Sequence, residues 1–176
     1  MKKEVIRLST KQTVFQLNGE DYGMDIFDVS TVEKDMKIKK LDSLPGNDKS
    51  LKNVNSLKNV NSLKNVKGKI SLRGEEIPVY NLRRKFGFED KNADIDTRYL
   101  ITNVNGKNIA FEVDNVKGID EIQSSDMYDV PSIIRCNNTS YIKSIANNKD
   151  NLVLILDSNK ILDDDEIKAL QDTEKK

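Results

Sequence analysis

The sequence contains no histidine, no tryptophan and a single cysteine. The absence of histidine removes the commonest general base, the commonest metal ligand and any imidazole pH switch. The lone Cys136 excludes an internal disulfide and fits a reducing compartment, and we interpret it as a passive thiol. Because no nucleophile with a nearby base, no phosphate-binding glycine loop and no paired metal ligands can be found, the sequence predicts no enzymatic activity, no cofactor and no metal site.

The sequence also lacks an excess of charge of either sign, and it has no long apolar run. Lysine plus arginine and aspartate plus glutamate both number 29, so the overall field draws the protein neither to nucleic acid nor to an anionic membrane. The longest purely apolar run, residues 152–156, is far shorter than the roughly 20 residues of a membrane span. No apolar signal-peptide segment follows the first residues. We therefore expect a cytoplasmic protein without direct membrane insertion, whose partners are recognised at short range.

An internal duplication indicates two similar halves. Residues 18–29 align without a gap on residues 105–116 at a constant offset of 87, and both segments begin with Asn-Gly. A second match has an offset of 76 and joins the segments 67–68 and 77–81 to 143–144 and 153–157. With 36% hydrophobic and 6% aromatic residues, each half can build only a thin core, so we expect the halves to lean on each other.

The duplication predicts a mainly β protein with two small domains. We place the first domain at residues 14–87 and the second at 96–162, with the charged, loop-like stretch 88–97 between them. A C-terminal helix is expected over residues 163–172. The seam between two such domains is a place where partners tend to bind.

Turn residues locate the expected strands. Asn18-Gly19 and Asn105-Gly106 predict two hairpins, because both central residues of a type I′ turn need positive φ. A third strand pair is expected to turn at Gly74. The predicted strands cover residues 14–17, 21–26, 29–32, 69–73, 76–82, 98–104, 108–113, 116–122 and 152–156.

Two short helical segments are predicted from their ends. Residues 83–86 form one helical turn that Gly87 stops. The run from Asp163 to Glu166 reads as an N-cap with its capping-box glutamate, and its carboxylates suit the positive end of the helix dipole. A metal reading of this run lacks the spacing and the glycine of a calcium loop.

Residues 50–67 hold three copies of the hexad Ser-Leu-Lys-Asn-Val-Asn, the last ending in Lys67. Apolar residues recur at every third position, so neither one face of a helix nor one side of a strand collects them. The matching segment of the second half is 11 residues shorter, close to two hexads. We predict a protruding loop inserted in the first domain, with a helical end near Leu63 and no chemistry. A stacked solenoid is the alternative.

Residues 67–87 carry the pattern K-G-x-I-x-L-R-G-x-x-I-P-V-x-x-L-R-x-x-F-G, which resembles the CheW family. The resemblance extends to the segments 22–26, 96–98, 111–116, 141–143 and 154–157, and covers nearly all of residues 14–162 except the hexads. It implies two five-stranded SH3-like β-barrel subdomains. It further implies a non-catalytic adaptor that couples chemoreceptor cytoplasmic tips to the histidine kinase CheA in bacterial chemotaxis arrays, recruited at the inner face of the membrane.

In that family one subdomain pairs with the regulatory domain of the kinase, and a groove between the subdomains takes the receptor tip. The partner-binding positions that the resemblance implies are Val29, Lys67, Gly68, Leu72, Arg73, Gly74, Val113 and Val116. Arg73 also has a physical case, because a guanidinium beside a glycine turn would stand in water and could fork onto a partner carboxylate. Each of these positions also has a plain alternative. Arg73 could be an ordinary exposed arginine, Gly68 a turn glycine, and Val29 and Val116 core residues.

The sequence departs from the family pattern at a few places. Ser30-Thr31-Val32 stands where Glu-Ile is common, Ser144 replaces a usual glycine, and the hexads enter beside Lys67 and could reshape the groove. Two other readings stay open. A CheA-regulatory-like or CheV-like protein would carry further domains, for which this chain has no room. A β-barrel that binds single-stranded nucleic acid would need a basic groove with aromatic platforms.

Overall fold

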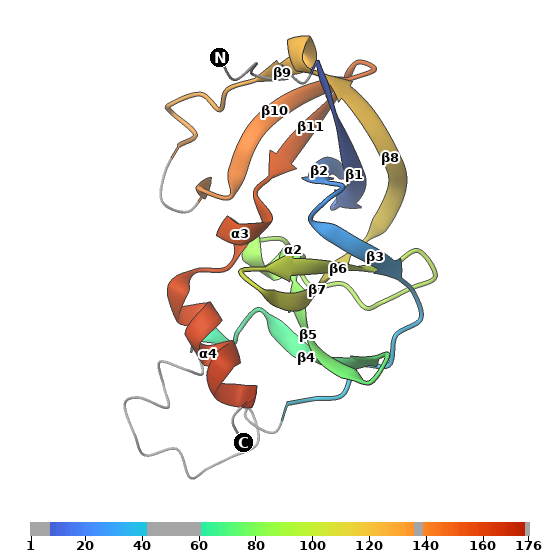
Figure 1. The fold of residues 1–176 in the computed structure, drawn as a ribbon, viewed down its shortest axis with the longest axis vertical. Coiled ribbons are helices and arrows are strands. Elements are labelled where there is room, and N and C mark those ends of the chain that lie inside the picture. Colours follow the sequence, from blue (N-terminus) through green and yellow to red (C-terminus); the bar gives the residue numbers. More distant parts are fainter. Residues whose placement is uncertain (1–7, 42–60, 136–138, 175–176) are drawn as a thin grey trace, which may run out of the picture.

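A computed structural model describes residues 8–41, 61–135 and 139–174. Its strands form two sheets, which lie one above the other in Figure 1 and are called here the upper and the lower sheet. The upper sheet contains β1 (Ser9–Leu17), β2 (Glu20–Asp25), β8 (Asn115–Gln123), β9 (Met127–Tyr128), β10 (Ile142–Asn148) and β11 (Asn151–Leu156). The lower sheet contains β3 (Val29–Glu33), β4 (Val66–Leu72), β5 (Glu75–Asn81), β6 (Arg98–Val104) and β7 (Lys107–Val113). The predicted mainly β fold with two SH3-like units is confirmed.

Four hairpins share one turn geometry. Both Asn-Gly turns have positive φ at the two central residues, 53° and 79° at Asn18 and Gly19 and 51° and 86° at Asn105 and Gly106. The β4–β5 turn repeats this with 50° at Arg73 and 82° at Gly74, and the β10–β11 turn with 52° and 67° at residues 149 and 150. The predicted hairpins are therefore confirmed, and the geometry is that of two-residue turns whose twist suits antiparallel strands.

The two halves of the chain exchange strands. The upper sheet has the order β8-β1-β2-β11-β10-β9 and the lower sheet β3-β6-β7-β5-β4. The upper sheet combines the hairpin β1–β2 of the first half with the strands β8 to β11 of the second half. The lower sheet combines the hairpin β6–β7 of the second half with the strands β3, β4 and β5 of the first half. The sheets therefore do not follow the predicted division into residues 14–87 and 96–162, because β2 pairs in parallel with β11 and β7 pairs in parallel with β5.

The duplication is visible in the irregular features of both sheets. Ile155 faces Gly23 across one parallel pair, and Val79 faces Ala110 at the same place in the other. The ladder of β4 shifts between Val66 and Gly68, and that of β10 shifts between residues 142 and 144. Since β-bulges re-aim side chains and fix register, their repetition indicates that both sheets keep one ancestral strand pattern.

Within the described residues the strands are accompanied by the helices α2 (Leu82–Lys85), α3 (Ser158–Ile161) and α4 (Asp164–Glu174) and by the 3-10 turn η1 (Ser124–Asp126). The predicted turn before Gly87 is α2, and the predicted C-terminal helix is α4. The capping box is formed, since the Asp163 amide donates to Glu166 Oε2 at 3.0 Å and the Glu166 amide donates to Asp163 Oδ1 at 2.8 Å. We did not predict α3, which is the duplicate of α2. Among the described residues, no helix has the length and apolarity needed to cross a bilayer.

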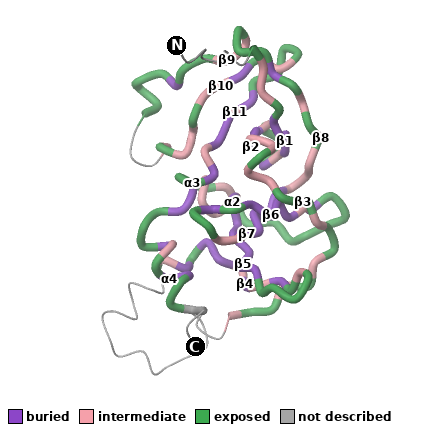
Figure 2. The backbone as a smooth tube through the Cα atoms, viewed as in Figure 1, coloured by how far each residue is buried: buried purple, intermediate pink, exposed green. Residues whose placement is uncertain are grey.

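The largest hydrophobic cluster joins the two sheets, as expected for halves that lean on each other. It contains Phe15 and Met24 from the upper sheet, Tyr80 and Phe111 from the lower sheet, and residues of α3 and α4. Smaller clusters fill each sheet separately, around Ile70 below and around Ile155 above. In Figure 2 most of the buried residues accordingly lie on strands, in both sheets.

The last hexad belongs to this core. Residues 61 and 62 are helical and Val66 opens β4, which confirms the helical end near Leu63. The side chains of Leu63, Asn65 and Val66 are buried. The expectation of a loop for the first two copies, and the interpretation of Cys136, lie outside the described residues.

Candidate partner-binding surface

The turn between β4 and β5 presents Arg73 to solvent. Arg73 and Gly74 are both exposed, and Arg73 holds the left-handed φ of 50°, which costs a residue with a Cβ some backbone strain. A type I′ turn favours asparagine at this position. Within the described part of the chain, the Arg73 guanidinium has no hydrogen bond or ion pair. The sheet therefore holds an unneutralised cation outward at a strained turn.

Lys67 lies on β4, the strand that leads into this turn, and its ammonium pairs with a carboxylate of the same chain. Its Nζ lies 2.9 Å from Glu112 Oε1 and 3.1 Å from Oε2, and the side chain of Glu112 is only 7% exposed. Burial and the adjacent Glu112 carboxylate raise the pKa of Tyr99 to about 12. Because a buried carboxylate needs a partner, Lys67 holds β4 onto β7 in addition to any role toward other proteins.

Gly68 is covered by its own chain. The amide and carbonyl groups of Lys39 and Lys69 exchange two hydrogen bonds of 2.8 Å across it. A Cβ at Gly68 would lie 2.2 Å from the Lys39 carbonyl oxygen. The backbone that approaches Gly68 closely is therefore that of residues 38–39 of the same chain. Leu72, at the end of β4, is half-buried against the lower cluster.

The three valines occupy two different settings. Val113 is 1% exposed and lies in the shared core. Val29 and Val116 are half-buried, pack against the shared core and sit at duplicate bulges on β3 and β8. Figure 1 shows β3 and β8 on one side of the molecule, where the two sheets meet. The structure thus divides the predicted positions into an exposed turn, a seam and buried supports.

The acidic residues that open α4 serve the lower sheet. The nearly buried Glu166 accepts hydrogen bonds from Tyr80 Oη at 2.7 Å and from Asn65 Nδ2 at 2.9 Å, and pairs with Lys85 Nζ at 3.1 Å. Burial and this carboxylate raise the pKa of Tyr80. Across the described residues no group of acidic side chains has the arrangement of a metal site. The carboxylate run therefore caps α4 and fastens it.

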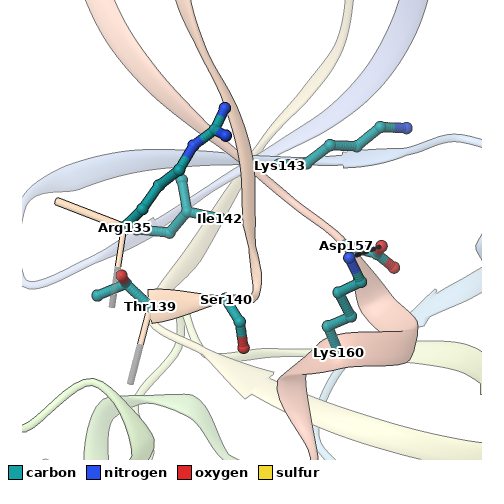
Figure 3. Close-up of a pocket in the computed structure, with 7 residues that line it drawn as sticks. All are labelled: Arg135, Thr139, Ser140, Ile142, Lys143, Asp157 and Lys160. Carbon is teal, nitrogen blue, oxygen red and sulfur yellow. Dashed lines mark ion pairs between the residues drawn. The ribbon is translucent and has the colours of Figure 1, made fainter. Parts of the chain in front are cut away.

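Sequence reasoning missed a basic pocket of about 440 Å³ below the upper sheet, drawn in Figure 3. Arg135, Lys143 and Lys160 line it together with Thr139, Ser140, Ile142 and Asp157. The duplication carries the signal that could have found it, because Lys143 and Lys160 are the counterparts of Lys67 and Arg84 at the offset of 76.

Comparisons with known proteins agree with this architecture. Residues 12–166 match the family described as CheW-like domain. The chain is 23% identical over 158 residues to the chemotaxis protein CheW of Bacillus subtilis, which covers 90% of both chains. Over 98 residues it is 34% identical to CheW of Helicobacter pylori, covering 56% of this chain and 59% of the relative. The solved structure of the scaffolding protein TtCheW from Thermoanaerobacter tengcongensis superposes with a TM-score of 0.71 and 27% identity, covering 89% of this chain and 94% of that one. The family match spans both sheets, so the chain belongs to the CheW-like family.

Proposed function

We propose that the protein is a non-catalytic adaptor that couples chemoreceptors to the histidine kinase CheA in a bacterial chemotaxis array. The observation that carries the proposal is the CheW-like match over residues 12–166, which includes both sheets and the seam between them. Relatives are described as chemotaxis proteins and TtCheW as a scaffolding protein. An adaptor that holds two partners at once raises their effective concentration without any covalent step. It acts in the cytoplasm, recruited to receptor arrays at the inner membrane face.

The exposed turn and the seam are the two proposed contact regions. Arg73, with Leu72 and Gly74 beside it, offers a forked cation to an acidic group of one partner. The seam at Val29 and Val116 offers half-buried apolar side chains to the receptor tip. Lys67, Gly68 and Val113 support these regions from inside, by pairing with Glu112, by admitting residues 38–39 and by filling the core.

Co-sedimentation with a receptor cytoplasmic fragment and CheA tests the proposal. Wild-type protein should bring the kinase into the pellet, and Arg73→Glu should reduce recruitment by about tenfold or more, as expected for loss of a charged interface contact. Lys149→Glu is the matched control, because Lys149 occupies the duplicate turn of the upper sheet with a φ of 52°. Recruitment by wild type that never exceeds background would disprove the adaptor function. Equal recruitment by both variants would disprove only the role of Arg73.

A further inference from the structure

The basic pocket below the upper sheet is built from three separate elements. Arg135 follows the turn at residues 132–134, Lys143 lies on β10 and Lys160 lies on α3. The pocket has a volume of about 440 Å³. Figure 3 shows the long side chains of Arg135 and Lys143 extending in different directions, away from Thr139 and Ser140.

Positive charge in this pocket exceeds negative charge. Asp157 is the only carboxylate among the seven lining residues, and its Oδ1 already accepts the Asn159 amide at 3.1 Å as the cap of α3. Its Oδ2 lies 4.0 Å from Lys160 Nζ. The side chains of Arg135 and Lys143 make no hydrogen bond or ion pair with the described part of the chain. Neither cation is therefore neutralised within the described chain, and Lys143 also borders a neighbouring pocket that contains Asp25 and Asp28.

The lower sheet provides an internal control for this surplus. There Lys67, the counterpart of Lys143, pairs with Glu112 at 2.9 Å. Arg84, the counterpart of Lys160, reaches both carboxylate oxygens of Asp90 at 2.9 Å. At the first of these positions the cation is neutralised in the lower sheet and unpaired in the upper sheet, whereas Lys160 keeps Asp157 at 4.0 Å. A surplus confined to one copy is not a requirement of the fold.

An exposed apolar turn adjoins the cations. Ile133 is 92% exposed and Ile134 is 41% exposed. The turn that carries them is closed by hydrogen bonds from the Ile134 amide to the Pro131 carbonyl at 2.9 Å and from the Arg135 amide to the Ser132 carbonyl at 3.2 Å. Apolar side chains held outward beside unpaired cations are typical of a surface that binds protein.

We propose that this pocket binds an acidic segment of a protein partner, with carboxylates on Arg135 and Lys143 and an apolar side chain against Ile133. The proposal rests on the adaptor function and adds a second, electrostatic contact to it. A single phosphate is the poorer fit, because a phosphate takes donors that converge on one point. The cations here come from three elements, and in Figure 3 their charged ends point to different places.

An NMR titration with a synthetic peptide of alternating glutamate and leucine tests the inference without kinase or receptor. Amide shifts should gather at residues 132–135, 142–143 and 160, and binding should weaken with added salt. Arg135→Glu combined with Lys143→Glu should weaken binding by about tenfold or more. Lys168→Glu, an exposed lysine on α4, makes the same kind of charge change outside the pocket and should leave the affinity unchanged.

Three results would overturn the inference. They are shifts that fall elsewhere, unchanged affinity in the double variant, or equally tight binding of inorganic phosphate or of a peptide with glutamine in place of glutamate. Each leaves the adaptor function intact as long as wild type still recruits kinase in the co-sedimentation test. Conversely, a failed co-sedimentation with a positive titration removes the adaptor function and keeps the acidic-segment site.

Discussion

The upper and lower sheets follow one strand pattern, but the buried cluster of the lower sheet has the larger side chains. The six buried residues of the lower cluster each have a counterpart in the upper sheet at the offsets of the duplication. In five pairs the lower residue is the larger: Ile70 against Ala146, Ile77 against Val153, Tyr99 against Gln12, Ile101 against Val14 and Ala110 against Gly23. One topology thus carries two sets of interior side chains of different volume, and we expect the lower sheet to be locally the more stable of the two.

The single exception shows how the upper sheet compensates. Ile155 is larger than its counterpart Val79, and a Cβ at Gly23 would lie 2.7 Å from Ile155 Cδ1. The extra methylene of Ile155 therefore fills the place that the side chain of Ala110 fills below. Gln12 has no such compensation, since its buried Oε1 has no hydrogen-bond partner in the described structure. The lower sheet is also covered by α4, which Glu166 fastens to Tyr80 and Asn65.

Glu166→Ala should have the largest effect on stability. It should also reduce the difference in amide protection between the lower and the upper sheet. It leaves Lys85 without its carboxylate and Tyr80 and Asn65 without an acceptor, so we expect a loss of about 3 kcal/mol in the free energy of unfolding. Urea unfolding measures the total. Amide exchange should show that β5 loses more protection than β11, because the network touches only the lower sheet.

Asp165→Ala is the control for Glu166→Ala, because Asp165 lies in the same helical turn and is exposed. Its effect should stay within about 0.5 kcal/mol. If Glu166→Ala lowered the protection of both sheets equally, the two sheets would unfold as one unit. Neither sheet would then have a local stability of its own.

Gly68→Ser and Ser144→Gly exchange the residues at one duplicate position and should have unequal effects on stability. Serine at position 68 brings a Cβ against the Lys39 carbonyl, so we expect a loss of about 1–3 kcal/mol. Glycine at position 144 should change stability by less than about 1 kcal/mol. Thermal unfolding of both variants decides this. A gain for Ser144→Gly as large as the loss for Gly68→Ser would show that the shared bulge, and not the segment covering Gly68, demands glycine.

These positions show which features a sequence can predict. The Asn-Gly hairpins, the turn of α2 and the capping box of α4 depend on residues a few positions apart, and all were predicted. The exchange of strands was not, because the pairing of β2 with β11 or with β5 leaves the same local pattern. The cover of Gly68 by Lys39 and the pocket around Lys143 likewise depend on contacts distant in the chain, although the duplication pointed to Lys143.

Gln12→Met should stabilise the protein by about 1 kcal/mol, because it replaces a buried amide oxygen that lacks a partner with an apolar chain of similar length. The gain should appear as increased protection of β1 and β8 in the upper sheet, with the lower sheet unchanged. Chemical denaturation and amide exchange measure the two parts of this expectation. A loss of stability would mean that the amide of Gln12 is satisfied in solution and that the upper interior is not deficient at this position.

The smallest effect is expected from removing residues 56–61, the middle hexad. Of the hexad segment the structure describes residues 61–67, and the buried side chains there, Leu63, Asn65 and Val66, belong to the last copy. Loop-closure entropy varies slowly with length, so shortening by one hexad should change the free energy of unfolding by only a few tenths of a kcal/mol. Urea unfolding against the full chain measures it.

Removing residues 62–67 instead gives the matched comparison, because the repeat makes the two shortened chains identical except at one position. The second chain carries asparagine where the first carries Lys67, since the middle copy supplies the same leucine, asparagine and valine. Only the ion pair with Glu112 is then missing, and we expect a loss of about 2 kcal/mol. If both deletions destabilised the protein equally, the number of hexads would matter and the pair would not. If only the removal of residues 62–67 destabilised the protein, the ion pair of Lys67 with Glu112 would be what holds the last hexad on β4.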